Sequence, residues 1–265
     1  MNNLAKKRAE LPKTTIIDNR KLSTSHQRLA EILQEGMAVL DVGCGTGAIT
    51  RGIAETVGEK GKVIGIDNNE DMIRKANEKH SLPNLSFEVA DIYALPFDSE
   101  FDIVTSARVL QWLENPTRAL SSMKNTVKLN GKVLVLDYNH KKIIWKPKIP
   151  KEMEAFYSSF LKWREDAGMV NTIADHLAYL FEKIGLDNIA IYPQHELVQK
   201  GEKTFESQIN IWSEVAEIKG KQMVEDGYLT EEERVIAEKK YRSWTQNKGE
   251  YLSMYLLAVE GVRRN

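Results

Sequence analysis

The sequence predicts an α/β protein built on a mostly parallel sheet. Three apolar runs with the character of buried strands each end in an acid, at Asp41, Asp67 and Asp91. Segments with helical periodicity separate these runs, and a glycine-rich turn follows the first of them. Because the carboxyl ends of parallel strands meet at one edge of a sheet, we expect the three acids to line that edge.

The stretch that organises the chain is residues 39–47, which read VLDVGCGTG. Gly43 and Gly45 permit positive φ where the chain reverses, and they let a ligand approach the backbone with no Cβ in the way. A helical pattern begins directly afterwards, so the stretch predicts a strand, a tight turn and a helix N-terminus. A crevice of this kind binds a nucleotide-like molecule.

The glycine spacing leaves two cofactors open. Gly43, Gly45 and Ala48 formally satisfy the dinucleotide fingerprint, with Asp67 at about the spacing of a ribose-binding acid. Asp41 separates the two, because a carboxylate two residues before the first glycine would repel the pyrophosphate of NAD or FAD. It suits the ammonium group of S-adenosylmethionine (SAM), so an NAD(P)-dependent oxidoreductase is the less favoured enzyme hypothesis.

Five segments match, in order and spacing, the motifs of the class I SAM-dependent methyltransferases. They read VLDVGCGTG, GIDNNEDMI, VADIYALPF, FDIVTSARVLQWL and LNGKVLVLD, and the resemblance covers roughly residues 25–140. It implies a Rossmann-like, seven-stranded, mostly parallel sheet of order 3-2-1-4-5-7-6 with a helical cap. Within this family, the sequence resembles the small-molecule group that contains the trans-aconitate, malonyl-ACP and ubiquinone-biosynthesis methyltransferases.

The cofactor residues follow from these motifs. Asp41 would face the methionyl ammonium, Asp67 would accept hydrogen bonds from both ribose hydroxyls, and Asp91 is a candidate acceptor for the adenine amino group. Met72, one helical turn beyond Asp67, would pack either against adenine or in the core. We interpret the single cysteine, Cys44, as a small loop residue in preference to a reactive thiol. The full expected set is Asp41, Gly43, Cys44, Gly45, Asp67, Asn68, Met72, Ala90, Asp91, Ile92 and Ser106.

The acceptor side begins after the fourth expected strand, residues 101–105. No Asn/Asp-Pro-Pro-Tyr/Phe motif follows it, which argues against an amino-methylating DNA methyltransferase. Leu110-Gln111-Trp112 is similar to the tripeptide of the trans-aconitate and malonyl-ACP methyltransferases, which esterify carboxylates. Many small-molecule relatives carry histidine where Gln111 or Trp112 stands. The expected substrate pocket comprises Arg108, Gln111, Trp112 and Trp145.

Two residues are candidates for catalysis. We expect the fifth strand at residues 132–137, with Tyr138 and His140 emerging over the site. His140 is either a general base or a partly exposed loop histidine. A carboxylate or thiolate needs no base, because methyl transfer from a sulfonium is accelerated mainly by positioning and desolvation. An amine or phenol must lose a proton, and then His140 or Tyr138 would act.

Helical segments fill the spaces between the strands. We expect helices from Leu22 to Glu35, from Asn69 to before Pro83, and from the Asn115-Pro116 pair onward. Two more follow Pro150, the second ending at Gly185. The basic run 141–151 is either solvated surface or an attractor of an anionic substrate.

The second half predicts an insertion. Residues 187–198 read as the sixth strand and residues 251–259 as the seventh, with two helices between them, the second opened by a Thr230–Glu233 capping box. An apolar stripe on the first of these helices would cover the acceptor pocket, which we favour, the body of the domain or a second subunit. It comprises Phe205, Ile209, Trp212, Ala216 and Met223. We therefore divide the chain into residues 1–21 as a solvated tail or lid, 22–200 with 249–265 as the SAM-binding domain, and 201–248 as a helical cap.

Composition restricts the partners. The 265 residues include 37 Lys and Arg against 38 Asp and Glu, so no overall field favours nucleic acid or an anionic membrane. The single cysteine excludes an internal disulfide and agrees with a reducing cytosol, so we expect a cytoplasmic protein, monomeric or homodimeric, without a bound metal. The expected activity is methylation of a small molecule, with an O-nucleophile slightly ahead of an amine. The non-enzyme alternative is a SAM-binding regulatory protein that lost its acceptor.

Overall fold

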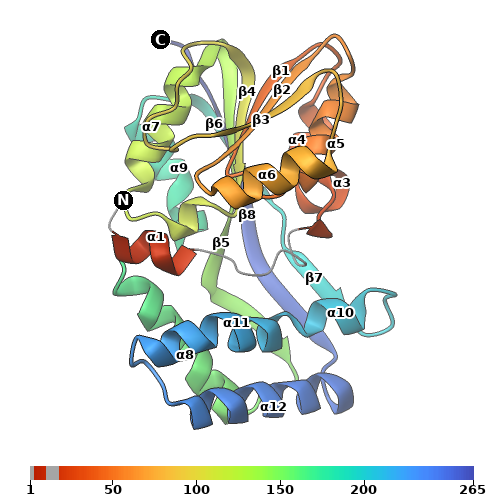
Figure 1. The fold of residues 1–265 in the computed structure, drawn as a ribbon, viewed down its shortest axis with the longest axis vertical. Coiled ribbons are helices and arrows are strands. Elements are labelled where there is room, and N and C mark those ends of the chain that lie inside the picture. Colours follow the sequence, from red (N-terminus) through yellow and green to blue (C-terminus); the bar gives the residue numbers. More distant parts are fainter. Residues whose placement is uncertain (1–2, 10–17) are drawn as a thin grey trace.

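The computed structural model describes residues 3–9 and 18–265 and contains a sheet of mixed direction at its centre. The strand order is β3-β2-β1-β4-β5-β8-β6, with β7 paired to β8 (Figure 1). The strands are β1 Ala38–Val42, β2 Lys62–Asp67, β3 Leu85–Val89, β4 Phe101–Ala107, β5 Val127–Lys146, β6 Asp187–Pro193, β7 Glu196–Gln199 and β8 Tyr251–Val262. The expected α/β fold and its 3-2-1-4-5-7-6 order are confirmed, with β8 in the place of the seventh strand.

Helices cover both faces of this sheet and also form a group below it (Figure 1). They are α1 Asn3–Ala9, α3 Leu22–Ser25, α4 Gln27–Ile32, α5 Ala48–Val57, α6 Glu70–Lys79, η1 Leu110–Trp112, α7 Pro116–Thr126, α8 Lys151–Glu165, α9 Ile173–Lys183, α10 Phe205–Ile209, α11 Ile211–Glu225 and α12 Glu231–Asn247. The helix expected over residues 22–35 is broken at His26, whose buried ring lies with Nε2 2.9 Å from Thr105 Oγ1.

The central strands are parallel and buried on both faces. β1 pairs with β2 and β4, β2 with β3, and β4 with β5, all in parallel, whereas β8 is antiparallel to β5 and β6. Val39 and Leu40 belong to two different apolar clusters, since successive side chains of a strand point to opposite faces. This double burial explains why the strands read as nearly continuous apolar runs.

The single strand expected over residues 187–198 is divided in two. β6 pairs with the C-terminal half of β8 and β7 with its N-terminal half, so the sheet has eight strands where seven were expected. Pro193 has no N–H to donate to the ladder, and the His195 ring lies with Nδ1 3.0 Å from the carbonyl oxygen of Leu256. The Gln194 N–H still donates to that oxygen at 3.1 Å, so the regular pairing with β8 is interrupted at the two residues between β6 and β7 and resumes at Glu196.

β5 is far longer than the segment 132–137 that hydrophobicity predicts. It continues to Lys146, and its last residues pair with the start of β8, from Ile144 with Ser253 to Lys146 with Tyr251. The two strands therefore run on together below the sheet (Figure 1). Tyr138 and His140 lie within this strand, so the expected emergent loop at these positions is wrong.

The lower group of helices packs around the extended ends of β5 and β8 (Figure 1). The insertion contributes α10, α11 and α12, three helices where two were expected, because residues 205–225 break at Asn210. All five residues of the apolar stripe are buried, and Trp212 meets Tyr157 and Phe160 of α8 with ring centroids 4.7 and 5.6 Å apart. The stripe is thus buried within the same chain.

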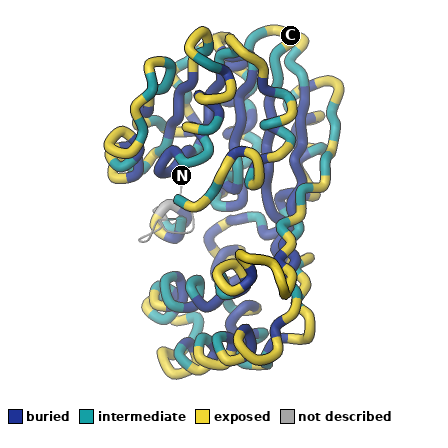
Figure 2. The backbone as a smooth tube through the Cα atoms, turned by 90° about the vertical axis from the view of Figure 1, so that its right-hand side faces the viewer, coloured by how far each residue is buried: buried dark blue, intermediate teal, exposed yellow. Residues whose placement is uncertain are grey.

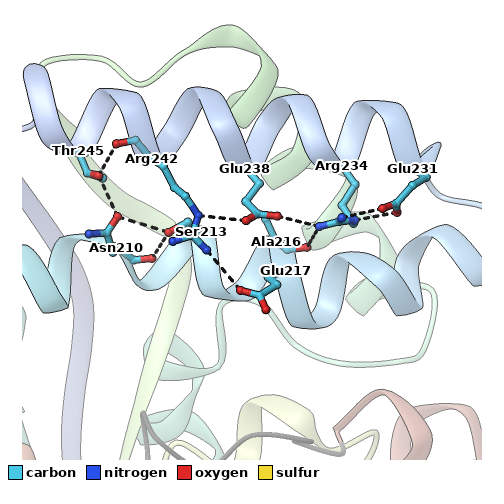
Figure 3. Close-up of polar contacts among 9 residues, drawn as sticks. All are labelled: Asn210, Ser213, Ala216, Glu217, Glu231, Arg234, Glu238, Arg242 and Thr245. Atoms are coloured by element: carbon cyan, nitrogen blue, oxygen red, sulfur yellow. Dashed lines mark hydrogen bonds and ion pairs between the residues drawn. The ribbon is translucent and has the colours of Figure 1, made fainter.

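Polar contacts join α11 to α12 along their length (Figure 3). Arg234 is buried, and it donates to Glu231, to Glu238 and to the carbonyl oxygen of Ala216. The expected capping box at Thr230 and Glu233 is present. The outward face of the lower helices is exposed and the start of β8 between them is largely buried, whereas residues 141–146 of β5 alternate between exposed and half-buried (Figure 2). No helix in the described ranges is long and apolar enough to cross a membrane.

Candidate active site

A cavity of about 450 Å³ lies at the carboxyl ends of β1, β2 and β4. All but two of the expected cofactor residues line it; those that do are Asp41, Gly43, Cys44, Gly45, Asp67, Asn68, Met72, Ala90 and Ile92. Of the expected substrate residues, Arg108 and Trp112 line it as well. The convergence follows from topology, because parallel strands bring distant acids to one edge.

The glycine loop is shaped by backbone contacts. The N–H groups of Gly43 and Cys44 both donate to the carbonyl oxygen of Ile66, at 2.7 and 2.9 Å, which anchors the loop to β2. Gly43 has φ +79°, and a Cβ there would collide with the side chain of Val109. The cradle therefore requires glycine at position 43 for conformation and for space.

Asp41 is a buried carboxylate facing the cavity. Its Oδ2 accepts a hydrogen bond from Thr50 Oγ1 at 2.7 Å. Burial raises the pKa of Asp41 to about 6, and the neighbouring Asp67 carboxylate adds to the rise. No cation among the described residues forms an ion pair with Asp41. A ligand carrying an ammonium group would meet this unbalanced charge.

Asp67 holds the loop and the start of α6 together. Its Oδ2 accepts from the Gly45 N–H and its Oδ1 from the Asn69 N–H, both at 3.0 Å. Burial raises its pKa, although these hydrogen bonds oppose the rise. Each carboxylate oxygen keeps a second lone pair, so Asp67 can still accept hydrogen bonds from a bound diol.

Two expected cofactor residues do not line the cavity. Asp91 is exposed, and its Oδ1 accepts from the Tyr93 N–H at 2.9 Å, which stabilises a local turn. Ser106 is fully buried and donates to the Val42 carbonyl oxygen at 2.8 Å, so it joins β4 to β1 behind the cavity. Its neighbour Ala107 lines the cavity instead, because side chains alternate along a strand.

The thiol of Cys44 is buried, and burial raises its pKa well above 9.0. A thiol that stays protonated is a poor nucleophile. This agrees with the interpretation of Cys44 as a small loop residue.

A second cavity, of about 700 Å³, adjoins the first and shares Arg20 and Arg108 with it. Its wall comes from the segment before α4, from the β6–β7 turn, from β8 and from α10 and α11. Tyr138 lies in this wall, as do several residues of the insertion. The two arginines thus stand where the two cavities meet.

Arg108 occupies this junction in a left-handed backbone conformation, with φ +63°. Its Nε donates to Tyr138 Oη at 3.0 Å and to Glu196 Oε1 at 3.1 Å, and its Nη2 donates to the Ser25 carbonyl oxygen. Burial alone would lower the pKa of Arg108, but the Glu196 carboxylate raises it above its ordinary value. Its Nη1 is buried and has no hydrogen-bond partner in the described part of the chain.

His140 and Gln111 lie in neither cavity, contrary to the expected placement of His140 over the site and of Gln111 in the pocket. His140 is buried in β5, with Nε2 2.6 Å from Gln111 Oε1. Arg164 also donates to that oxygen, so the oxygen is an acceptor and His140 Nε2 carries its hydrogen. Burial, with Arg164 nearby, lowers the pKa of His140 well below 6.5. The interpretation as a partly exposed loop histidine is wrong.

Trp145 and the basic run also lie away from the cavities. The Trp145 Nε1 donates to Tyr241 Oη at 3.3 Å, and its ring meets Trp212 and Tyr157 in the lower core. Three lysines of the run pair with acids, namely Lys141 with Glu165, Lys142 with Asp175 and Lys148 with Glu154. This pairing favours solvated surface over attraction of a substrate.

The described parts of the N-terminal segment form hydrogen bonds with the rest of the chain, both before and after residues 10–17. Ala9 lines the first cavity, and Arg8 donates to Asp226 and to the carbonyl oxygen of Trp163. Asp18 accepts from Thr46 Oγ1 and from Lys79 Nζ. Residues 10–17, which belong to the expected tail or lid, lie outside the described residues.

The cavity residues that sequence reasoning missed include Arg20, Glu196 and Val109. Arg20 lies in a polar segment with no periodic pattern, and Glu196 lies in what reads as a continuous strand. No local signal marks either one. Only the packing of residues 18–25 and of the β6–β7 turn against β5 brings them to Arg108.

The family model described as a methyltransferase domain matches residues 33–239. The chain belongs to this family. It is a class I SAM-dependent methyltransferase, as the five motifs indicate, with SAM as its cofactor.

Among curated proteins, a ubiquinone/menaquinone biosynthesis C-methyltransferase UbiE from Shewanella piezotolerans is 33% identical over 172 residues. The match covers 62% of this methyltransferase, which spans 64% of the length of that relative.

Solved structures show the same fold at low identity. A SAM-dependent methyltransferase from Aquifex aeolicus superposes with a TM-score of 0.52 and 20% identity, covering 98% of this chain and 96% of the other. Haemonchus contortus phosphoethanolamine N-methyltransferase 2, solved with phosphomonomethylethanolamine and S-adenosylhomocysteine, gives a TM-score of 0.55 and 18% identity over 90% of this chain and 52% of its own.

Proposed function

We propose that this methyltransferase transfers a methyl group from SAM, bound in the first cavity, to a small molecule bound in the second. The observation that carries the proposal is the shared wall at Arg20 and Arg108, because a donor and an acceptor in adjoining cavities can meet there. Two adjoining cavities favour an enzyme over a regulatory protein that kept only the cofactor site.

The first cavity suits SAM in three ways. Asp41 provides a negative charge for the methionyl ammonium, Asp67 has spare lone pairs for the ribose hydroxyls, and Met72 and Ile92 provide apolar surface for adenine. A dinucleotide would place a pyrophosphate against Asp41 and Asp67, which disfavours the oxidoreductase alternative. When bound, SAM supplies an electrophilic methyl group on a sulfonium.

An O-nucleophile that ionises by itself is favoured over an amine. His140 is turned toward Gln111, away from both cavities. Tyr138 donates its hydroxyl hydrogen to Glu196, and burial raises its pKa. Arg108 and Arg20 hold the pKa of Glu196 below its ordinary value, although burial opposes them. None of these groups is suited to remove a proton at neutral pH.

The relatives named C-methyltransferases raise the possibility of a carbon acceptor. A carbon acceptor must also lose a proton, which neither Tyr138 nor Glu196 is suited to remove; His195, which also lines the second cavity, would then have to act as the base.

The insertion with its neighbours would act as the cap of the acceptor cavity. Thr204, Gln208 and Ile211 from the insertion line that cavity, which supports the expected cap. α8 and the extended ends of β5 and β8 share an apolar core with the insertion, so the cap would include them as well as residues 201–248. A cap that excludes water would assist displacement at a sulfonium.

The test of this function is turnover. The full chain with SAM would be incubated with a library of carboxylic acids, phenols, thiols and amines, and S-adenosylhomocysteine would be measured above the rate without acceptor. We expect acceptor-dependent product. Tight SAM binding with no turnover on any acceptor class would favour the regulatory alternative.

A further inference from the structure

We propose that the acceptor is a monocarboxylate with an apolar body, and that Arg20 and Arg108 bind its carboxylate at the junction of the two cavities. The inference rests on the proposed function, because it assigns the substrate class and the specificity-determining residues of the same site.

The charges at the junction are unbalanced. Arg108 forms an ion pair with Glu196, and Arg20 has no hydrogen bond or ion pair to any described residue. The next charged groups inward are Arg164 and Asp137, which partly offset one another. Among these five groups one positive charge remains, which can bind one anion.

The arginines also repel each other, which costs free energy in the absence of a ligand. Burial and the positive charge of Arg108 both lower the pKa of Arg20. The Nη1 group of Arg108 is a further unmet donor. A carboxylate placed between the two guanidinium groups would relieve the repulsion and accept hydrogen bonds from both.

The second cavity, and not the donor's own carboxylate, best accounts for this arrangement. Arg108 is oriented by the side chains of Tyr138 and Glu196, and both of these line the second cavity and not the first. Asn19, beside Arg20, also lines only the second cavity. The residues that contact Arg108 or adjoin Arg20 therefore belong to the wall of the second cavity.

The rest of the second cavity determines what the carboxylate is attached to. Glu202 and Glu214 lie in its wall and would repel a second acid group. Leu197, Ile211 and Met254 provide apolar surface. A volume of about 700 Å³ accommodates a medium-sized apolar body.

The reaction balances without a base. One carboxylate oxygen would use a lone pair to form a bond to the donor's methyl carbon, as the carbon–sulfur bond breaks and its electron pair stays on sulfur. The products are a methyl ester and a neutral thioether, and no proton is released. Because the ester is uncharged, its attraction to Arg20 and Arg108 is lost, which favours release.

The test compares acceptors that share one body and differ in the head group. Decanoate, decylamine, decanol and decanamide, with phenylacetate as a shorter acid, would be offered to the full chain with SAM. Methyl ester would be identified by mass spectrometry, and binding of each probe to the protein loaded with S-adenosylhomocysteine would be measured by calorimetry. We expect binding and methylation of one or both acids only.

The variants are Arg20→Gln, Arg20→Lys and, as a control, Arg51→Gln on the exposed face of α5. Arg20→Gln leaves no partner unpaired among residues 3–9 and 18–265, so the fold should persist. It should raise KM for the acid roughly 10- to 100-fold, the effect of losing a charged hydrogen bond, with SAM affinity within about threefold of the parent. Arg20→Lys should recover part of the loss, and Arg51→Gln should match the parent.

Three results would overturn the inference: methylation of the amine with no binding of any acid, failure of both acids to bind at millimolar concentration, or a loss of SAM affinity in Arg20→Gln equal to the loss for the acid. The last would assign the arginines to the donor's carboxylate. In each case intact SAM binding and turnover on another acceptor would leave the proposed function standing.

Discussion

We expect SAM binding to depend on pH through Asp41. Burial raises its pKa to about 6, whereas its ordinary value is 3.8. If the ligand's ammonium requires the ionised carboxylate, about nine tenths of the protein can bind SAM at pH 7 and about one tenth at pH 5. The dissociation constant should therefore be about tenfold higher at pH 5.

In the free protein, ionisation of Asp41 lowers the free energy of unfolding, whereas it favours SAM binding. A carboxyl whose folded pKa is raised contributes stability below pH 3.8 and loses it as the pH rises through about 6, at a cost of about 3 kcal/mol. The ligand's ammonium would offset that cost. The rise in Tm on adding ligand should therefore be larger at pH 7 than at pH 5.

Calorimetry with S-adenosylhomocysteine, which keeps the ammonium, between pH 5 and 7 would measure the first effect. Asp41→Asn should bind 10- to 100-fold more weakly at pH 7 and lose most of the pH dependence. Asp71→Asn, an exposed acid of α6, is the control. An Asp41→Asn variant that keeps the full pH dependence would refute the reasoning and move the titration to Asp67.

Three further predictions concern the ribose site, the buried histidine and the cap. Asp67→Ala should weaken SAM binding by about 2–4 kcal/mol, which calorimetry would detect; an affinity within threefold of the parent would contradict the assignment. His140→Gln should keep the shape of the pH–rate profile and lose less than about tenfold in rate; a thousandfold loss with the acidic limb abolished would show that His140 is the base. Ile211→Trp should fill part of the second cavity and raise KM for the acceptor with SAM affinity unchanged; equal loss of both would place the acceptor elsewhere.

The strands and the cofactor edge were largely readable from the sequence. Short-range signals carry them: apolar runs that end in Asp41 and Asp67, and glycines whose conformations only that residue adopts readily. These signals can be read from the sequence because each depends only on a few residues that are adjacent along the chain. The strand order came from the family resemblance. The hydrophobic pattern shows that strands and helices alternate along the chain, but it does not show which strands are neighbours in the sheet.

The acceptor side was decided by tertiary structure. β5 runs to Lys146 because β8 pairs with it, and this pairing buries His140, which the sequence alone places in a loop. Ser106 points toward β1 because of its register in β4. Any two of Arg20, Arg108 and Glu196 are separated by 88 residues or more along the chain, and no local pattern relates them. Their common position depends on long-range packing. This is why the sequence by itself determined the methyl donor, whereas the site proposed for the acceptor could be found only from the fold.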